Sequence, residues 1–79
     1  MDWVLYKGYR IQSAPYQLAD SSEFTININI WHDTGDAVNT RNFSAGNIFK
    51  AKQEAVQHCI EFGRQIIDDK IANCTVSDL

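Results

Sequence analysis

The clearest pattern in the chain is a helical one in its C-terminal third. From Lys52 to Ala72, apolar side chains recur at the spacing of one helix face, and polar side chains occupy the opposite side. The apolar arc covers roughly half of the circumference, which is typical of a helix that lies on a sheet. The arc contains Ala55, Val56, Cys59, Ile60, Gly63, Ile66, Ile67 and Ile71. The pattern therefore predicts one long amphipathic helix over residues 52–72.

Gly63 lies near the centre of this arc. A glycine inside a helix costs about 1 kcal/mol relative to alanine, so its presence needs a structural reason. We expect the helix backbone to approach a bulky sheet residue closely at Gly63, with a kink as the alternative. At the helix ends, Ala51 is a poor N-cap, and Asp68 and Asp69 oppose the helix dipole. The last turn is therefore expected to fray.

The strongest strand pattern runs from Phe24 to Trp31, where apolar and polar residues alternate strictly. One side of this strand carries Phe24 and three isoleucines, which would face the helix. Before it, residues 9–13 alternate, and the alternative is a strand that continues past Pro15 to Leu18. Residues 3–6 are a short apolar run that would add an extra strand at the start, and a returning strand over residues 37–43 follows a turn. The expected fold class is α+β, with an antiparallel sheet of three to four strands and one C-terminal helix on one face (β-β-β-α). Residues 1–72 would form a single domain, and residues 73–79 a flexible tail.

Composition and charge exclude several classes of function. The 79 residues suffice for one small core, and the net charge of −3 argues against broad binding to nucleic acids or acidic membranes. No apolar run is long enough to span a bilayer, and the N-terminus lacks the regions of a signal peptide. We therefore expect a cytoplasmic protein. In a reducing compartment Cys59 is expected to be buried in the core and Cys74 to be an exposed thiol, without a disulfide between them.

Two groups of residues are candidates for chemistry. His32, Asp33 and Asp36 form a local cluster, but they occupy a hairpin turn in which aspartate and glycine are expected for backbone reasons. His58 and Cys59 are adjacent, but a helix separates their side chains by about 100°. No phosphate loop, CxxC motif or dinucleotide turn is present in the sequence. We expect no enzymatic activity, no cofactor and no metal site.

The sheet face that the helix leaves open is the best candidate for a function. Three interpretations remain: a solvated face, a protein contact that includes homodimerisation, and nucleic-acid binding, because arginine with asparagine or glutamine can read base edges. A protein–protein interaction module is the leading prediction, and nucleic-acid binding is the alternative. The candidate binding residues on this face are Arg10, Gln12, Asn27, Asn29, Trp31 and Arg41, with Phe43 expected as a further exposed aromatic.

Short motifs along the chain add a resemblance. They read Tyr6-x-Gly8-Tyr9-x-Ile11, Phe43-Ser44-x-Gly46, Phe49 followed by Glu54-Ala55, and Glu61-Phe62-Gly63-Arg64-x-x-Ile67-Asp68. In this combination the chain resembles a family of small uncharacterised bacterial proteins, and the similarity extends to about Lys70. Relatives often place threonine where this chain has Ala51. The resemblance implies the same sheet-plus-helix fold, but no settled function and no catalytic or binding residue.

Overall fold

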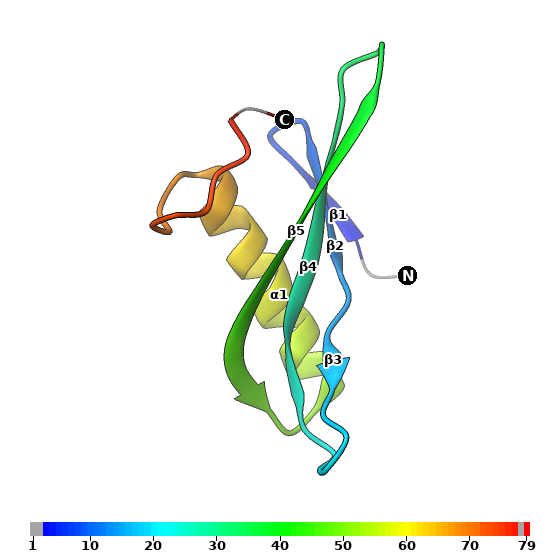
Figure 1. Ribbon diagram of the computed structural model, residues 1–79, viewed down its shortest axis with the longest axis vertical. Coiled ribbons are helices and arrows are strands. Elements are labelled where there is room, and N and C mark those ends of the chain that lie inside the picture. The colour runs from blue at the N-terminus through cyan, green and yellow to red at the C-terminus, as the bar shows by residue number, and fades with distance from the viewer. Residues whose placement is uncertain (1–2, 78) are drawn as a thin grey trace.

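Within the described part of the chain, five antiparallel strands form one sheet, and a single helix covers one of its faces (Figure 1). The computed structural model describes residues 3–77 and 79. The predicted α+β class is confirmed. The elements in chain order are β1 (Trp3–Tyr6), β2 (Tyr9–Ser13), β3 (Tyr16–Gln17), β4 (Phe24–Asp33), β5 (Val38–Phe49) and α1 (Lys52–Ile67).

The long central strand β4 organises the sheet. On one side β4 pairs with β5, and on the other side it pairs with both β2 and β3. Ser13 pairs with Ile28 and Tyr16 with Thr25, so β2 and β3 follow one register that is interrupted only at Ala14 and Pro15. Proline has no N–H to donate to a ladder, which explains the interruption. β1 forms the outer edge next to β2.

Tight turns set the register of both hairpins. Lys7 and Gly8 join β1 to β2 with positive φ angles of 51° and 85°, as a two-residue hairpin turn requires. Gly35, with a φ of 91°, lies at the tip of the hairpin between β4 and β5. β5 is longer than the returning strand predicted over residues 37–43. It continues to Phe49 because a bulge, which leaves Gly46 and Asn47 without partners on β4, absorbs the break in the pattern.

The core lies between β2, β4 and α1. Its buried apolar residues include Ile11 from β2, Ile28 and Ile30 from β4, and Cys59 and Ile66 from α1. The isoleucine row of β4 therefore faces the helix, as predicted.

The close approach predicted at Gly63 is confirmed. A Cβ atom at Gly63 would lie 2.6 Å from Cγ2 of Ile11, which is a fully buried side chain. The glycine therefore lets the helix backbone sit directly on β2.

The helix ends earlier than the sequence predicts, at Ile67 instead of Ala72. Asp69 has a left-handed φ of 60°, and its N–H donates to the Ile66 carbonyl oxygen. The N–H of Lys70 donates to the Gln65 carbonyl oxygen, which completes a Schellman-type helix end. Aspartate tolerates the left-handed conformation better than most residues, and this local preference wins over the apolar spacing that extends to Ile71. At the other end Ala51 is the N-cap and makes no side-chain cap, as expected.

The segment after α1 turns back onto the sheet (Figure 1). Val76 is a buried core residue with 4% of its surface exposed. The Arg41 guanidinium donates to the Thr75 carbonyl oxygen at 3.0 Å, and His32 Nδ1 lies 2.9 Å from the Leu79 carbonyl oxygen. Val76 therefore finds apolar partners that its position near the C-terminus does not reveal. The flexibility expected over residues 73–79 stays a prediction. Asp78 lies outside the described residues.

Candidate interaction surface

The strand registers determine which side chains share the open face of the sheet. Arg10 pairs with Trp31, and Gln12 pairs with Asn29. Because side chains alternate along a strand, these residues and Asn27 point away from α1, on the face opposite Ile11, Ile28 and Ile30. The structure thus brings five of the six predicted binding residues onto one face.

Arg41 does not belong to this face, which corrects the prediction. Ile30 pairs with Arg41 and Ile28 pairs with Phe43, so both β5 residues lie on the helix side. The Arg41 guanidinium reaches the tail at Thr75, and Phe43 packs against the core. The prediction was wrong because it assigned the odd-numbered residues of β5 to the open side, whereas the hairpin register assigns them to the helix side.

Exposed apolar side chains gather on the same open face. Trp3 and Leu5 pair with Gln12 and Arg10, Tyr16 and Ile48 both pair with Thr25, and Val38 pairs with Asp33. All five positions therefore point away from α1. Among residues 3–77 and 79, the large apolar side chains that are exposed are Trp3 (44%), Leu5 (69%), Tyr16 (61%), Val38 (56%) and Ile48 (54%). Such a concentration on one face marks an interaction surface more often than scattered apolar residues do.

Sequence reasoning missed these five residues, although a signal for most of them was present. A two-residue turn at Lys7 and Gly8 places Leu5 opposite Arg10, so it fixes the face of β1 once β2 is assigned. The same counting through the hairpin at Gly35 fixes the face of Val38.

An amide cluster occupies the centre of the open face. The Asn42 side-chain amide donates to Oδ1 of Asn27 and to Oδ1 of Asn29, both at 3.0 Å. The Asn27 amide donates to the Ala14 carbonyl oxygen at 3.1 Å, and Asn27 is only 5% exposed. The central asparagines are thus held by neighbours on β4 and β5, and they present an ordered, uncharged surface.

One end of the face combines aromatic, aliphatic and charged groups. The Arg10 guanidinium lies 4.6 Å from the centre of the Trp3 ring, in cation–π geometry. Leu5, Gly8, Arg10, Trp31, Asp33 and Val38 line a shallow hollow of about 190 Å³. The Trp31 Nε1–H is covered and has no hydrogen-bond partner among the described residues. This end of the face is therefore a shallow hollow in which aromatic, aliphatic and charged groups lie side by side.

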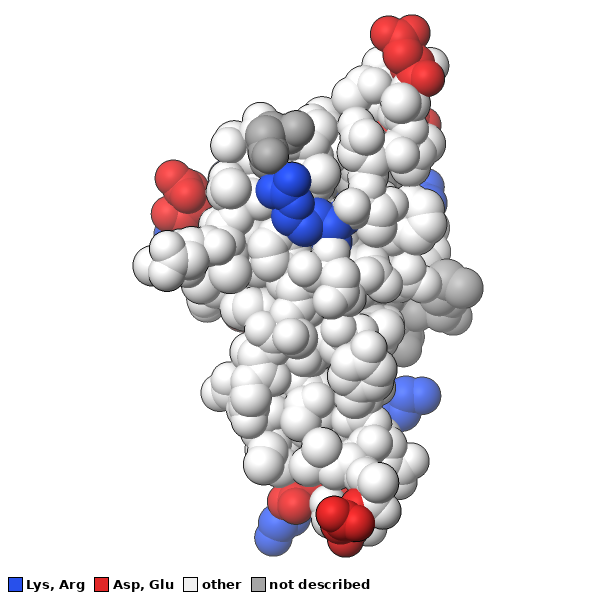
Figure 2. All heavy atoms as spheres, in the orientation of Figure 1, with Lys and Arg blue, Asp and Glu red and all other residues white. Residues whose placement is uncertain are grey.

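Charged side chains are unevenly distributed over the side of the molecule that Figure 2 shows. In the orientation of Figure 1, acidic groups lie at the tip of the β4–β5 hairpin, and acidic and basic groups lie at the opposite end. Between these ends a basic group lies in the upper half and further charged groups lie at the left and right edges, with uncharged surface around them. Within the strands, Arg10 and Asp33 are the charged residues whose described register places them on the open face.

The residues considered for catalysis do not converge. His32 lies on the helix side, where its ring contacts Tyr9 with 4.6 Å between ring centres, whereas Asp33 accepts a hydrogen bond from the Gly35 N–H at 2.8 Å in the turn. His58 stacks on Phe49 at 4.5 Å. Burial raises the pKa of the Cys59 thiol, which lies 3.6 Å from the Asn27 carbonyl oxygen. The described part of the chain holds no group of three or more histidine, cysteine or acidic side chains that could bind a metal ion.

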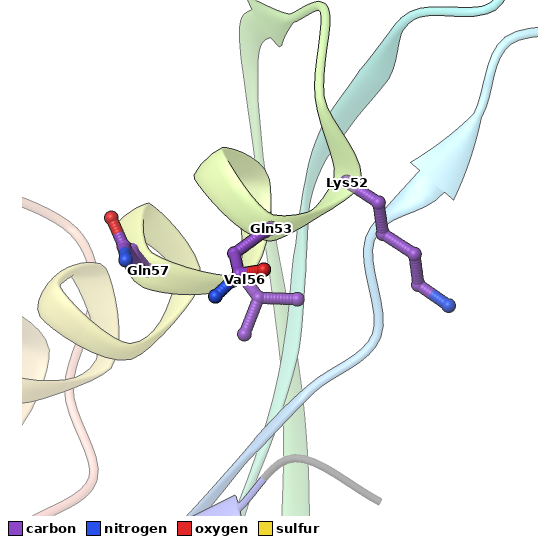
Figure 3. Close-up of a pocket in the computed structure, with 4 residues that line it drawn as sticks. All are labelled: Lys52, Gln53, Val56 and Gln57. Atoms are coloured by element: carbon purple, nitrogen blue, oxygen red, sulfur yellow. The ribbon is translucent and has the colours of Figure 1, made fainter.

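A further hollow lies beside the first two turns of α1 (Figure 3). It has a volume of about 400 Å³ and is lined by Lys52, Gln53, Val56 and Gln57. It is open to solvent, and its polar lining consists of one lysine and two amides, without a histidine or carboxylate beside the lysine.

A charged cluster connects the β1–β2 turn to the end of α1. The Tyr6 hydroxyl donates to Oδ2 of Asp68 at 2.7 Å, and the Lys7 ammonium donates to Oδ1 of the same carboxylate at 2.5 Å. The hydrogen bond from Lys7, followed by that from Tyr6, lowers the pKa of Asp68 below its ordinary value of 3.8. The same hydrogen bonds to Asp68 raise the pKa values of Lys7 and Tyr6.

We expect this cluster to make the unfolding free energy depend on pH. Because the pKa of Asp68 is lower in the folded chain, its contribution is fully present above the ordinary value of 3.8 and is lost as the pH falls through the folded value. Asp68→Asn should therefore be less stable than the wild type at neutral pH, and the difference should shrink below about pH 4. Urea unfolding of both proteins at several pH values measures this difference. The control is Asp20→Asn, which makes the same change at an exposed turn residue. A difference that stays constant with pH would contradict the assignment.

Comparisons with known proteins add no relative. No protein-family model matches the chain, and no curated protein and no solved structure was found to match it. The resemblance to a bacterial family stays a prediction. Among the described residues, no helix has the length and apolar character needed to cross a membrane.

Proposed function

We propose that the protein is a non-enzymatic interaction module that self-associates through the open face of its sheet. The observation that carries this proposal is the location of the exposed large apolar side chains on that one face, opposite α1. Burying this surface would remove apolar area from water without disturbing the core, because the core lies on the other side of the sheet.

A second copy of the chain is the partner that fits this face best. Apolar residues lie at both ends of the face, and the uncharged amide cluster lies between them. A two-fold contact brings the same patch of both copies together, so a face rich in one charge would repel itself. Arg10 and Asp33 carry opposite charges, and the remainder of this face along the described strands is uncharged.

The test is sedimentation equilibrium of the full chain with a matched pair of variants. Leu5→Glu adds a negative charge to the most exposed apolar residue of the face, whereas Gln57→Glu adds the same charge to an exposed position of α1. We expect Leu5→Glu to weaken association by at least about tenfold, which corresponds to about 1.4 kcal/mol. Gln57→Glu should associate like the wild type. A monomeric wild type, or an assembly unaffected by Leu5→Glu, would refute the proposal.

Nucleic-acid binding stays an alternative prediction, and the strand registers support it less than the sequence does. Of the two arginines expected on the open face, the register leaves only Arg10 there. Titration with DNA and RNA at low and high salt tests it, because phosphate contacts give a steep dependence on salt. Arg10→Ala should abolish any such binding if this alternative is correct.

A further inference from the structure

The free edge of β5 is a second surface of the sheet that has an unusual character. β5 pairs with β4 on one side, and among the described elements it contacts only β4 and α1. An exposed strand edge is a template for pairing with another chain, and proteins usually protect such edges with lysine, proline, a bulge or a short strand. The strands at the opposite edge, β1 and β3, are only four and two residues long.

β5 lacks most of these protections over residues 38–45. This segment contains no lysine, proline, aspartate or glutamate, and its register with β4 is regular. Its single charged residue, Arg41, lies on the helix side and donates to the Thr75 carbonyl oxygen. The bulge appears only beyond Ala45, at Gly46 and Asn47.

The ladder shows which backbone groups point to the free edge. The Thr34 N–H donates to the Ala37 carbonyl oxygen, so these two residues form a hydrogen-bonded pair. In an antiparallel ladder such pairs recur at every second residue, so Arg41 and Phe43 also bond to β4, through Ile30 and Ile28. The Asn27 carbonyl oxygen accepts from the Ala14 N–H on the other side of β4, which agrees with this alternation. The N–H and C=O groups that point away from β4 are therefore those of Val38, Thr40, Asn42 and Ser44.

We infer that the free edge of β5 pairs antiparallel with β5 of a second copy, with Asn42 opposite Asn42 on the two-fold axis. In this register Thr40 pairs with Ser44 of the other copy. The backbone N–H and C=O groups that point away from β4 in one copy therefore meet the same kind of groups in the other. A shift by one residue would oppose groups that are already bonded to β4. In this register Arg41 lies opposite Phe43 of the other copy, so no two like charges are opposed.

This inference rests on a different surface from the proposed function and does not depend on it. The two-fold axis of the edge contact is perpendicular to the sheet, so both helices stay on one side and the two open faces form one larger surface. If both contacts form and their axes intersect, the result is a closed tetramer with two-fold axes at right angles.

Two double variants in the Leu5→Glu background test the edge contact separately from the open face. Thr40→Lys with Ser44→Lys places lysine opposite lysine twice across the axis, whereas Thr40→Lys with Ser44→Asp places lysine opposite aspartate. By sedimentation equilibrium, we expect the lysine–aspartate protein to remain a dimer, with twice the 9.0 kDa mass of one chain. The lysine–lysine protein should be a monomer, with the mass of one chain. Equal masses for the two proteins would overturn the inference.

Backbone hydrogen exchange gives a second and independent readout on the wild-type chain. The N–H groups of Thr40, Asn42 and Ser44 should exchange more slowly as the protein concentration rises, because pairing protects them. The N–H groups of Arg41 and Phe43 serve as controls, since β4 protects them at every concentration. Fast exchange of the three outward groups at high concentration would exclude edge pairing even if the open face associates.

Discussion

Gly63→Ala is expected to lower the free energy of unfolding by about 1–3 kcal/mol, the usual cost of an overpacked core. At an unhindered helix position the same change would stabilise the protein by up to about 1 kcal/mol, because alanine is the better helix former. The sign is reversed at this position because the new Cβ would lie 2.6 Å from Cγ2 of Ile11. Gly63→Leu should destabilise the fold still more. Urea unfolding measures both changes, and an unchanged midpoint for Gly63→Ala would contradict the prediction.

A double-mutant cycle with Ile11 shows whether this contact is the cause. Ile11→Ala alone should cost about 2–5 kcal/mol, because it leaves a cavity at a fully buried position. In the double variant the methyl group introduced at position 63 occupies part of that cavity instead of clashing. The combined loss should therefore be smaller than the sum of the two single losses. Additive losses would show that Gly63→Ala acts through another part of the helix.

The sequence carried enough information for the core but not for the faces of every strand. Residues 24–31 alternate so regularly that the side facing the helix follows directly, and Gly63 could be interpreted because it interrupts an otherwise bulky apolar arc. β5 lacks such a pattern, because apolar residues occur at both even-numbered and odd-numbered positions. Val38 lies on one face of the strand, and Phe43 and Ala45 lie on the other. Only the hairpin register, set by the turn around Gly35, determines which of these two sets of side chains faces α1.

This ambiguity decided the prediction of the candidate surface. Alternation alone allows Arg41 and Phe43 on the open face, and it gives no reason to place Val38 and Ile48 there. The apolar run over residues 3–6 does not show which way Trp3 and Leu5 point, because a four-residue strand has too few positions to reveal its two faces. Long-range pairing across the sheet, which depends on the turns, supplied the missing information.

The burial of Val76 leads to the second large stability effect. α1 ends at Ile67, so the helix does not cover the end of the sheet near the β4–β5 hairpin. The tail supplies the cover: Val76 joins the cluster that contains Ile66, and the Tyr9 hydroxyl lies 3.4 Å from the Val76 carbonyl oxygen. We expect a tail that packs in this way to contribute to the free energy of unfolding.

Val76→Ala is therefore expected to lower the free energy of unfolding by about 2 kcal/mol, from the loss of two buried methyl groups and the cavity that they leave. Val76→Asp should cost more, because it would bury an unpaired carboxylate beside Ile66. Ser77→Ala, at the exposed neighbouring position, is the control and should change stability by less than about 0.5 kcal/mol. Thermal and urea unfolding measure these differences. If Val76→Ala matched the control, the tail would be the flexible segment that its terminal position predicts, and the end of the sheet near the hairpin would be stable without it.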